Sequence, residues 1–340
     1  MKKINVGVIG AGRIGKLHSE VLLTRIPEAN LVKIAEPNEE SLKVWKDIYN
    51  LPDEMITADY KEILEADEIE AVLICSPTNM HAQMIIESAQ AGKQIFCEKP
   101  IDFDLNMISE ALQAVESTGV KLQIGFNRRF DPSFRNVHKR VAKGDIGDPH
   151  IVKITSRDPA PPPLEYVKVS GGIFLDMMIH DFDMARYLSG QEVTEVRAIG
   201  DTLINKDFAQ YGDVDTAIVT LKFANGTMGV IDNSRQAIYG YDQRVEVFGT
   251  QGCLRAANEH PNTVTYYGAK TIQQDNIPYF FLERYMTSFT DEMTEFINCI
   301  SQDKKPLVTG EDGLKAALIA LAATQSLKEG KSIKISDIEG

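Results

Sequence analysis

The feature that most constrains the fold of this chain is the alternation of short apolar runs with helical patterns over about its first 125 residues. Helical spacing, often closed by Gly or Asn, fills the intervals between the runs. Alternation of this kind predicts an α/β fold with a doubly wound parallel sheet. The expected strands are 4–10, 30–36, 71–77, 94–100 and 121–126.

The sequence changes character after about residue 125. Longer runs that alternate apolar and polar residues follow, with turn signals at "ANG" and "GTQG". They predict a second α/β domain with a largely antiparallel sheet, followed by helices at 288–301 and 313–330. Because 340 residues exceed what one core usually organises, we expect two domains, 1–124 and 125–340, with the C-terminal helix a candidate to pack back on the first. The expected strands of the second sheet are 150–158, 192–204, 215–236, 243–257 and 262–268.

The charge balance argues against several classes of partner. The chain has 49 acidic and 36 basic side chains, a net charge of −13, without basic clusters. Such a chain is a poor match for nucleic-acid backbones and anionic membranes, and no apolar run approaches the roughly 20 residues that span a bilayer. Its 4 cysteines are widely spaced, which favours reduced thiols over disulfides or a zinc module. We therefore expect a cytoplasmic protein.

The motif "GAGRIG" directly follows the first expected strand and precedes a helical pattern. Its glycines are Gly10, Gly12 and Gly15. At this spacing the first permits a tight turn, the second admits a pyrophosphate, and the third allows close helix–strand packing. The phosphates of a dinucleotide then lie at the helix N-terminus, beside Arg13 and Ile14.

Glu36 ends the second expected strand, 21 residues after Gly15. An acid at this position accepts hydrogen bonds from the adenosine ribose hydroxyls and repels a 2′-phosphate. Residues 37–39 contain no Arg or Lys to receive that phosphate. The sequence therefore predicts NAD as the cofactor in preference to NADP. The alternative is that Glu36 is an ordinary solvated acid at a strand end.

A polar stretch follows the strand that ends near residue 77. Ligands of doubly wound sheets lie beyond the carboxyl ends of the strands, so this stretch is expected to line the cofactor. His81 has an equal alternative as a cap of the helix that begins there. The residues concerned are Ser76, Pro77, Thr78, Asn79 and His81.

The stretch "EKP" places Glu98 and Lys99 at the carboxyl end of the next strand, where both are expected to contact the cofactor. Pro100 prevents the strand from continuing. A lysine here can hold a substrate hydroxyl or carry a proton. The alternative is a structural ion pair of Lys99 with Glu98.

The apolar stretch 171–188 carries Asp176 and His180 at positions i and i+4 of an expected helix, on one face. An Asp can orient an imidazole so that its other nitrogen removes a proton from an alcohol. Two alternatives are a buried structural pair and a metal site. No further His or Cys cluster completes a ligand set, so we expect no metal.

Four stretches together resemble the Gfo/Idh/MocA oxidoreductases: "GVIGAGRIG" with a following His, "EKP", "GFNRRFD" and "GGIFLDMMIHDFDMARYL". The segment "RDPAPPP", followed by "VKVSGG", resembles the inositol 2-dehydrogenase branch. The resemblance covers essentially the whole chain. It implies an N-terminal Rossmann domain and a C-terminal α/β domain for substrate binding and oligomerisation, whose open sheet commonly packs in tetramers.

The resemblance also implies roles for individual residues. His180 is the acid/base, Asp176 orients it or binds a neighbouring hydroxyl, and Lys99 holds the reacting oxygen. The family commonly has Asp where this chain has Glu36, which makes strict NAD preference less secure. Further hydroxyl-binding candidates are Asn127, Arg128, Arg129, Asp158, Tyr239 and Tyr241.

The expected function is NAD-dependent oxidation of a secondary hydroxyl of a cyclic polyol, foremost myo-inositol to 2-keto-myo-inositol. Polar residues that hydrogen-bond each hydroxyl discriminate strongly between epimers. The alternatives are oxidation of scyllo-inositol or a pyranose, and a non-catalytic, nucleotide-responsive regulator of the same fold. A regulator is expected to lack part of the Lys, Asp and His set, which this chain keeps complete.

Overall fold

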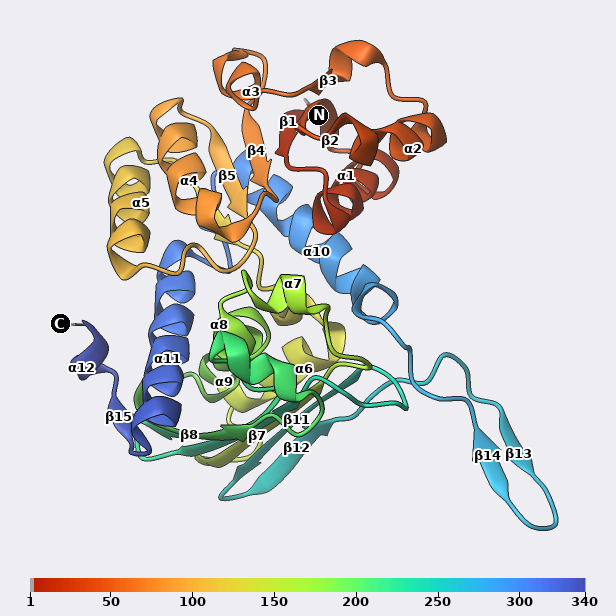
Figure 1. Ribbon diagram of the computed structural model, residues 1–340, viewed down its shortest axis with the longest axis vertical. Helices are drawn as coiled ribbons and strands as arrows, with labels where there is room; N and C mark the ends of the chain where they lie inside the picture. The colour runs from red at the N-terminus through yellow and green to blue at the C-terminus, as the bar shows by residue number, and fades with distance from the viewer. Residues whose placement is uncertain (1–2, 340) are drawn as a thin grey trace. The chain divides into compact units, whose positions relative to one another are not determined.

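The computed structural model describes residues 3–339 (Figure 1), and the chain forms two compact units. The first consists of Met1–Asn127 and Thr287–Lys315, and the second of Arg128–Met286 and Ala316–Gly340. Two long helices, α10 (Phe281–Ser301) and α11 (Gly310–Glu329), have residues in both units.

The first unit contains a six-stranded sheet in the order β3-β2-β1-β4-β5-β6, with every pair parallel. This confirms the predicted doubly wound sheet, to which the structure adds the short edge strand β3. Every residue of the central strand β4 is buried, as expected for a parallel sheet covered on both faces. The strands are β1 (Ile4–Ile9), β2 (Ala29–Ala35), β3 (Ile56–Thr57), β4 (Ala71–Ile74), β5 (Gln94–Cys97) and β6 (Leu122–Ile124).

Helices connect these strands in the places that the helical patterns predict. Capping explains several boundaries: the side chains of Asn38 and Asp104 accept from backbone N–H groups at the starts of α2 and α5, and Gly119 ends α5 in the left-handed conformation. The helices are α1 (Arg13–Arg25), α2 (Glu39–Tyr49), α3 (Lys61–Glu65), α4 (His81–Gln90) and α5 (Leu105–Thr118), with 3-10 turns η1 (Asp53–Met55) and η2 (Thr78–Met80).

The second unit contains a seven-stranded sheet in the order β12-β11-β7-β10-β9-β8-β15. It is mostly antiparallel, as predicted, and the turns "ANG" and "GTQG" connect antiparallel neighbours. The exception is the pair β7 and β10, which is parallel. The strands are β7 (Pro149–Arg157), β8 (Val193–Asp201), β9 (Thr216–Phe223), β10 (Met228–Ser234), β11 (Asp242–Gly249), β12 (Gly252–Ala256) and β15 (Ile333–Lys334).

The expected strand 262–268 does not join this sheet. Its central residues form β13 (Thr265–Tyr267), which pairs only with β14 (Ile272–Gln274) in a separate two-stranded hairpin (Figure 1). The apolar side chains of the hairpin are exposed, with Tyr267 at 76% and Ile272 at 69%. The alternating pattern of 262–268 predicted a half-buried strand, but the apolar side chains of this hairpin are not packed against a core.

Helices cover one face of the second sheet. The alternation along the strands places Val219, Ile231 and Val247 on the buried face, where α9 packs against β7 and α6 packs against α9. The helices of this unit are α6 (Pro132–Ala142), α7 (Leu164–Val167), α8 (Gly172–Asp176), α9 (Ile179–Ser189) and α12 (Ser336–Glu339), with 3-10 turns η3 (Asn127–Phe130), at the unit boundary, and η4 (Lys206–Tyr211).

The prediction of one continuous helix over 171–188 is wrong. The structure has two helices, α8 and α9, separated at Met177 and Met178. The Met178 N–H donates to the Ile173 carbonyl at 2.8 Å, five residues back, which widens the turn. Asp176 is therefore the last residue of α8, and His180 lies in the first turn of α9.

Candidate functional site

The three glycines of the first loop have the distinct environments that the motif predicts. Gly10 has φ +93°, and a Cβ there would meet the Cys75 carbonyl at 2.7 Å. A Cβ on Gly15 would collide with the Gly10 carbonyl, so Gly15 permits close packing of α1 on β1. A Cβ on Gly12 would have no neighbour within 4 Å. The loop is therefore open at Gly12, which fits the approach of a pyrophosphate to the N-terminus of α1.

Glu36 lies against this loop. Its Oε2 accepts a hydrogen bond from the Ala11 N–H at 2.8 Å, and its Oε1 accepts one from the Asn38 N–H at 3.0 Å. The structure thus brings together the strand-end acid and the glycine turn, which are separated by about 25 residues of sequence. The arrangement fits an adenosine ribose whose hydroxyls bind the carboxylate.

The polar stretch after β4 contains exposed residues, the half-buried Ser76 and Thr78, and one buried histidine. Pro77 and Asn79 are exposed, whereas His81 is 1% exposed. The imidazole lies 2.8 Å from the Pro100 carbonyl through Nδ1 and 2.8 Å from the Ser76 carbonyl through Nε2. Burial lowers the pKa of His81, against the opposing effect of these two carbonyls. His81 therefore holds together the segments that follow β4 and β5.

Glu98 lies against a buried histidine. Its Oε1 lies 2.7 Å from Nε2 of His18, a fully buried histidine of α1. A second carboxyl, Glu292 of α10, is also fully buried; burial raises the pKa of Glu292 well above its ordinary value, and the neighbouring Glu98 raises it further. No sequence motif indicates Glu292, because this residue lies in an ordinary amphipathic helical pattern. Lys99 itself is half-buried and is joined to Pro100 by a cis peptide bond.

In the second unit, Asp176 is held from two sides. Nη1 of Arg235 lies 3.0 Å from Oδ2 of Asp176, and the Tyr166 hydroxyl donates to Oδ1 at 2.7 Å. The same guanidinium nitrogen lies 3.4 Å from Oδ2 of Asp158. Burial raises the pKa of Asp158, and Arg235 opposes this effect. Sequence reasoning missed Arg235 and Tyr166, although Tyr166 lies only three residues after the segment "RDPAPPP".

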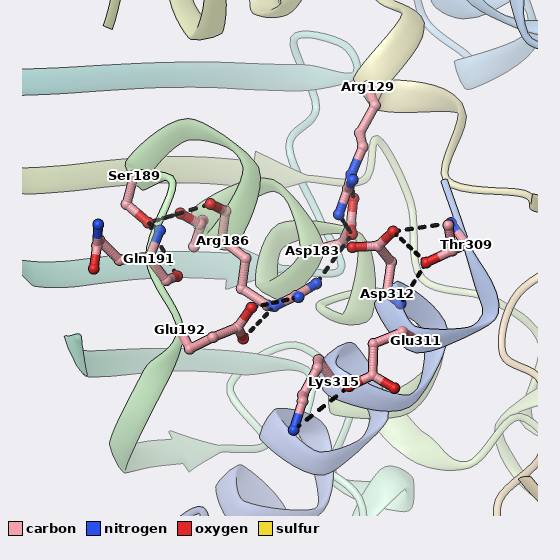
Figure 2. Close-up of polar contacts among 11 residues, drawn as sticks. Arg129, Asp183, Arg186, Ser189, Gln191, Glu192, Thr309, Glu311, Asp312 and Lys315 are labelled. Atoms are coloured by element: carbon pink, nitrogen blue, oxygen red, sulfur yellow. Dashed lines mark hydrogen bonds and ion pairs between the residues drawn. The ribbon is translucent and has the colours of Figure 1, made fainter. Parts of the chain in front are cut away.

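Two further acids of this region, Asp181 and Asp183, form buried ion pairs. Arg128 contacts Asp181 at 2.5 Å, with both side chains buried. Arg129 binds Asp183 through Nε at 2.8 Å and Nη2 at 2.5 Å, as Figure 2 shows. Arg129 is 6% exposed, so the structure gives this predicted hydroxyl-binding residue a buried carboxylate as its partner.

The other predicted hydroxyl-binding residues have varied environments. The Tyr239 hydroxyl donates to Asp242 at 2.6 Å, and its ring is 42% exposed. Tyr241 is buried; its hydroxyl accepts from Arg128 at 3.4 Å, and burial raises the pKa of Tyr241 to about 12. Asn127 is buried at 4% exposure, and His180 is half-buried.

Metal centres and membrane-spanning helices are two other classes of site, considered over the described range 3–339. No group of three or more His, Cys, Asp or Glu side chains in this range is arranged to hold a metal ion. Every helix in the same range is too short or too polar to cross a membrane.

Comparison with known families agrees with both units. Residues 4–126 match the model of an oxidoreductase family with an NAD-binding Rossmann fold, and residues 134–255 match the GFO/IDH/MocA C-terminal domain. The chain belongs to the Gfo/Idh/MocA oxidoreductase family. The predicted family is thereby confirmed, and the first unit is an NAD-binding Rossmann domain.

Individual relatives extend over almost the whole chain. An uncharacterised oxidoreductase of Bacillus subtilis, YrbE, is 53% identical and covers 99% of this chain and 98% of its own. The myo-inositol 2-dehydrogenase of Thermotoga maritima is 46% identical, over 99% of this chain and 100% of its own. The crystal structure of Lactobacillus casei scyllo-inositol dehydrogenase with NAD(H) and scyllo-inositol has a TM-score of 0.92 at 32% identity, covering 98% of this chain and 100% of that one.

Proposed function

We propose that this oxidoreductase uses NAD to oxidise a secondary hydroxyl of a cyclic polyol to a ketone, with myo-inositol, which would give 2-keto-myo-inositol, as the foremost substrate. The observation that carries the proposal is the group of Asp158, Asp176 and Arg235, because carboxylates close together are suited to accepting hydrogen bonds from neighbouring hydroxyls. The similarity to a myo-inositol 2-dehydrogenase supports the same substrate class.

Three residues are proposed to act on the substrate. His180 takes the proton of the reacting hydroxyl, since an imidazole is suited to proton transfer near neutral pH. Lys99 holds the reacting oxygen through its ammonium group. Asp176 binds a neighbouring hydroxyl, a role supported by its position between Arg235 and Tyr166. When bound, NAD supplies the acceptor for the hydride that leaves the carbon.

The cofactor is proposed to be NAD in preference to NADP. The loop from Gly10 to Gly15 would hold the pyrophosphate, and Glu36 would bind the ribose hydroxyls and repel a 2′-phosphate. Glu36→Ala is expected to weaken NAD binding and reduce the preference over NADP. An unchanged ratio of the two affinities would contradict this role.

The proposed function is tested by following the reduced-nicotinamide absorbance with NAD or NADP and each of myo-inositol, scyllo-inositol and glucose. Rapid reduction of NAD with an inositol supports the proposal and identifies the stereoisomer. The second candidate, scyllo-inositol, is favoured by the similarity to the scyllo-inositol dehydrogenase structure. Absence of reduction with every polyol, in protein that binds NADH, would refute the proposal.

The assembly is proposed to be a homotetramer, with 1–124 as the NAD-binding domain and 125–340 as the substrate and oligomerisation domain. The face of the second sheet opposite α9 supports this, because strand register places four exposed apolar side chains on that one face. Exposed apolar patches of this kind are typical of interfaces. Light scattering coupled to size exclusion tests the proposal. The four exposed apolar residues on this face of the sheet are Ile199, Ile218, Met228 and Phe248.

A further inference from the structure

Four side chains meet in the second unit, and we refer to them as the carboxylate clamp: Asp158, Tyr166, Asp176 and Arg235. Two of them, Asp158 and Arg235, directly follow adjacent parallel strands. Ser234 at the end of β10 is in register with Arg157 at the end of β7, and the Asp158 N–H donates to the Ser234 carbonyl at 2.9 Å. Arg235 and Asp158 are therefore neighbours because β7 and β10 run in the same direction.

The Pro-rich segment connects two members of the clamp. It begins at Asp158, continues through Pro159 and the three prolines of 161–163, and reaches Tyr166 in α7. Asp158 contacts Arg235, and Tyr166 donates to Asp176. Proline restricts the backbone between these two anchors, which lowers the number of conformations available to the segment.

The clamp places two carboxylates on a single guanidinium nitrogen. Arg235 is 3% exposed, and both its contacts, at 3.0 and 3.4 Å, use Nη1. Two carboxylates this close disfavour each other's ionised form, whereas a guanidinium between them favours it. Asp158 contacts Arg235 through Oδ2, and 24% of its side chain is exposed.

We propose that Arg235 and Tyr166 are positioning residues, which hold Asp176 and Asp158 so that the two carboxylates accept hydrogen bonds from adjacent hydroxyls of the polyol. This inference rests on the proposed function, and it adds the two residues that determine where the acceptor oxygens lie. The Pro-rich segment thereby contributes to substrate specificity, because it connects Asp158 to Tyr166. A site of this kind discriminates by the geometry of a pair of hydroxyls.

The first variant is Tyr166→Phe, which removes only one hydroxyl. The ring is 48% exposed, so folding is expected to remain intact. Because a hydrogen bond to a charged group is lost, kcat/KM for the polyol is expected to fall about tenfold, mainly through a higher KM. The dissociation constant of NADH should remain unchanged.

Two further variants, Arg235→Lys and Arg235→Met, change the guanidinium. Met removes the charge and is expected to lower kcat/KM by about 100-fold or more, because two carboxylates lose their partner. Lys keeps the charge without the planar fork and is expected to restore part of the loss. Arg186→Lys is the matched control: Arg186 is 8% exposed and binds Glu192 at 2.7 Å (Figure 2), outside the clamp.

The pH profile separates a positioning role from a purely structural one. Since Arg235 opposes the effect of burial on the pKa of Asp158, its removal is expected to move the acidic limb of kcat/KM to higher pH. Arg186→Lys should leave that limb in place. The charged and titratable groups that face Asp158 include Arg235, Asp176, Arg128, Tyr166 and Tyr241. A further carboxyl, Asp213, faces Arg235 and Asp176.

A substrate-free measurement distinguishes failure of the clamp from failure of the proposed function. In Arg235→Met the two carboxylates lose the guanidinium between them and repel each other when ionised, so the melting temperature should fall below that of the wild type at pH 8 and approach it towards pH 4. A difference in melting temperature between Arg235→Met and the wild type that does not change with pH overturns the clamp. The clamp is also overturned if Tyr166→Phe and Arg235→Lys both keep the wild-type KM, kcat and pH profile. Wild-type protein that oxidises no inositol overturns the proposed function instead.

Discussion

A methyl group added at Gly12 is expected to weaken cofactor binding without destabilising the protein. The added Cβ would have no neighbour within 4 Å, and the backbone at Gly12, with φ −66°, is accessible to alanine. The melting temperature of Gly12→Ala should therefore stay within about 2 °C of the wild type. The methyl would occupy the space that the pyrophosphate approaches, and overpacking typically costs about 1–3 kcal/mol. This corresponds to a dissociation constant for NADH raised roughly 5- to 150-fold.

Gly10→Ala is the matched control, since it changes the same atoms two residues earlier. Its φ of +93° disfavours alanine by about 1–2 kcal/mol. Contact with the Cys75 carbonyl adds about 1–3 kcal/mol. The sum, about 2–5 kcal/mol, lowers the melting temperature by about 5–15 °C.

Both variants can be assayed by fluorescence titration with NADH and by thermal unfolding without ligand. The two variants should differ: Gly12→Ala should lose affinity for NADH, and Gly10→Ala should lose thermal stability. Wild-type NADH affinity in Gly12→Ala would refute the position assigned to the pyrophosphate. A fall in melting temperature equal to that of Gly10→Ala would refute the open environment of Gly12.

Three further predictions concern other parts of the chain. Because burial raises the pKa of Glu292, the folded protein keeps a proton on this carboxyl at pH values where the unfolded chain releases it, so wild-type stability falls as pH rises. In denaturant titrations Glu292→Gln should therefore be more stable than the wild type at pH 8 and equal to it near pH 4. Arg128→Met leaves Asp181 buried without its cation and should cost about 3–5 kcal/mol of unfolding free energy, much of it restored by adding Asp181→Leu. His180→Ala should lower turnover about 10²–10⁴-fold with NADH binding intact, and unchanged turnover would remove it from the mechanism.

Much of the first unit could be predicted because its signals are local. Strand composition, helix stops and the spacing of Gly10, Gly12 and Gly15 all act within a few residues. Glu36 could be related to the glycine loop because a doubly wound sheet brings the ends of its first two strands together. Its contact with Ala11 is the direct consequence of that topology.

The second unit shows where periodicity stops being sufficient. The helical pattern of 171–188 gave no sign of the break at Met177 and Met178, because both flanking segments are apolar and helical by themselves. Arg129 has the chemistry of a hydroxyl-binding residue, yet it lies beside Asp183, 54 residues later. An ion pair of this kind depends on how α9 packs, which no local pattern encodes.

The sequence by itself determined the order of strands and helices, the glycine turn with its strand-end acid, and the set of Lys99, Asp176 and His180 that marks the family. The tertiary structure alone decided the environment of Asp176. Arg235 lies 77 residues from Asp158, and the two meet because β7 and β10 are parallel within an otherwise antiparallel sheet. Side-chain alternation predicts which face of a strand is buried, but it does not predict which distant strand becomes its neighbour or in which direction that neighbour runs.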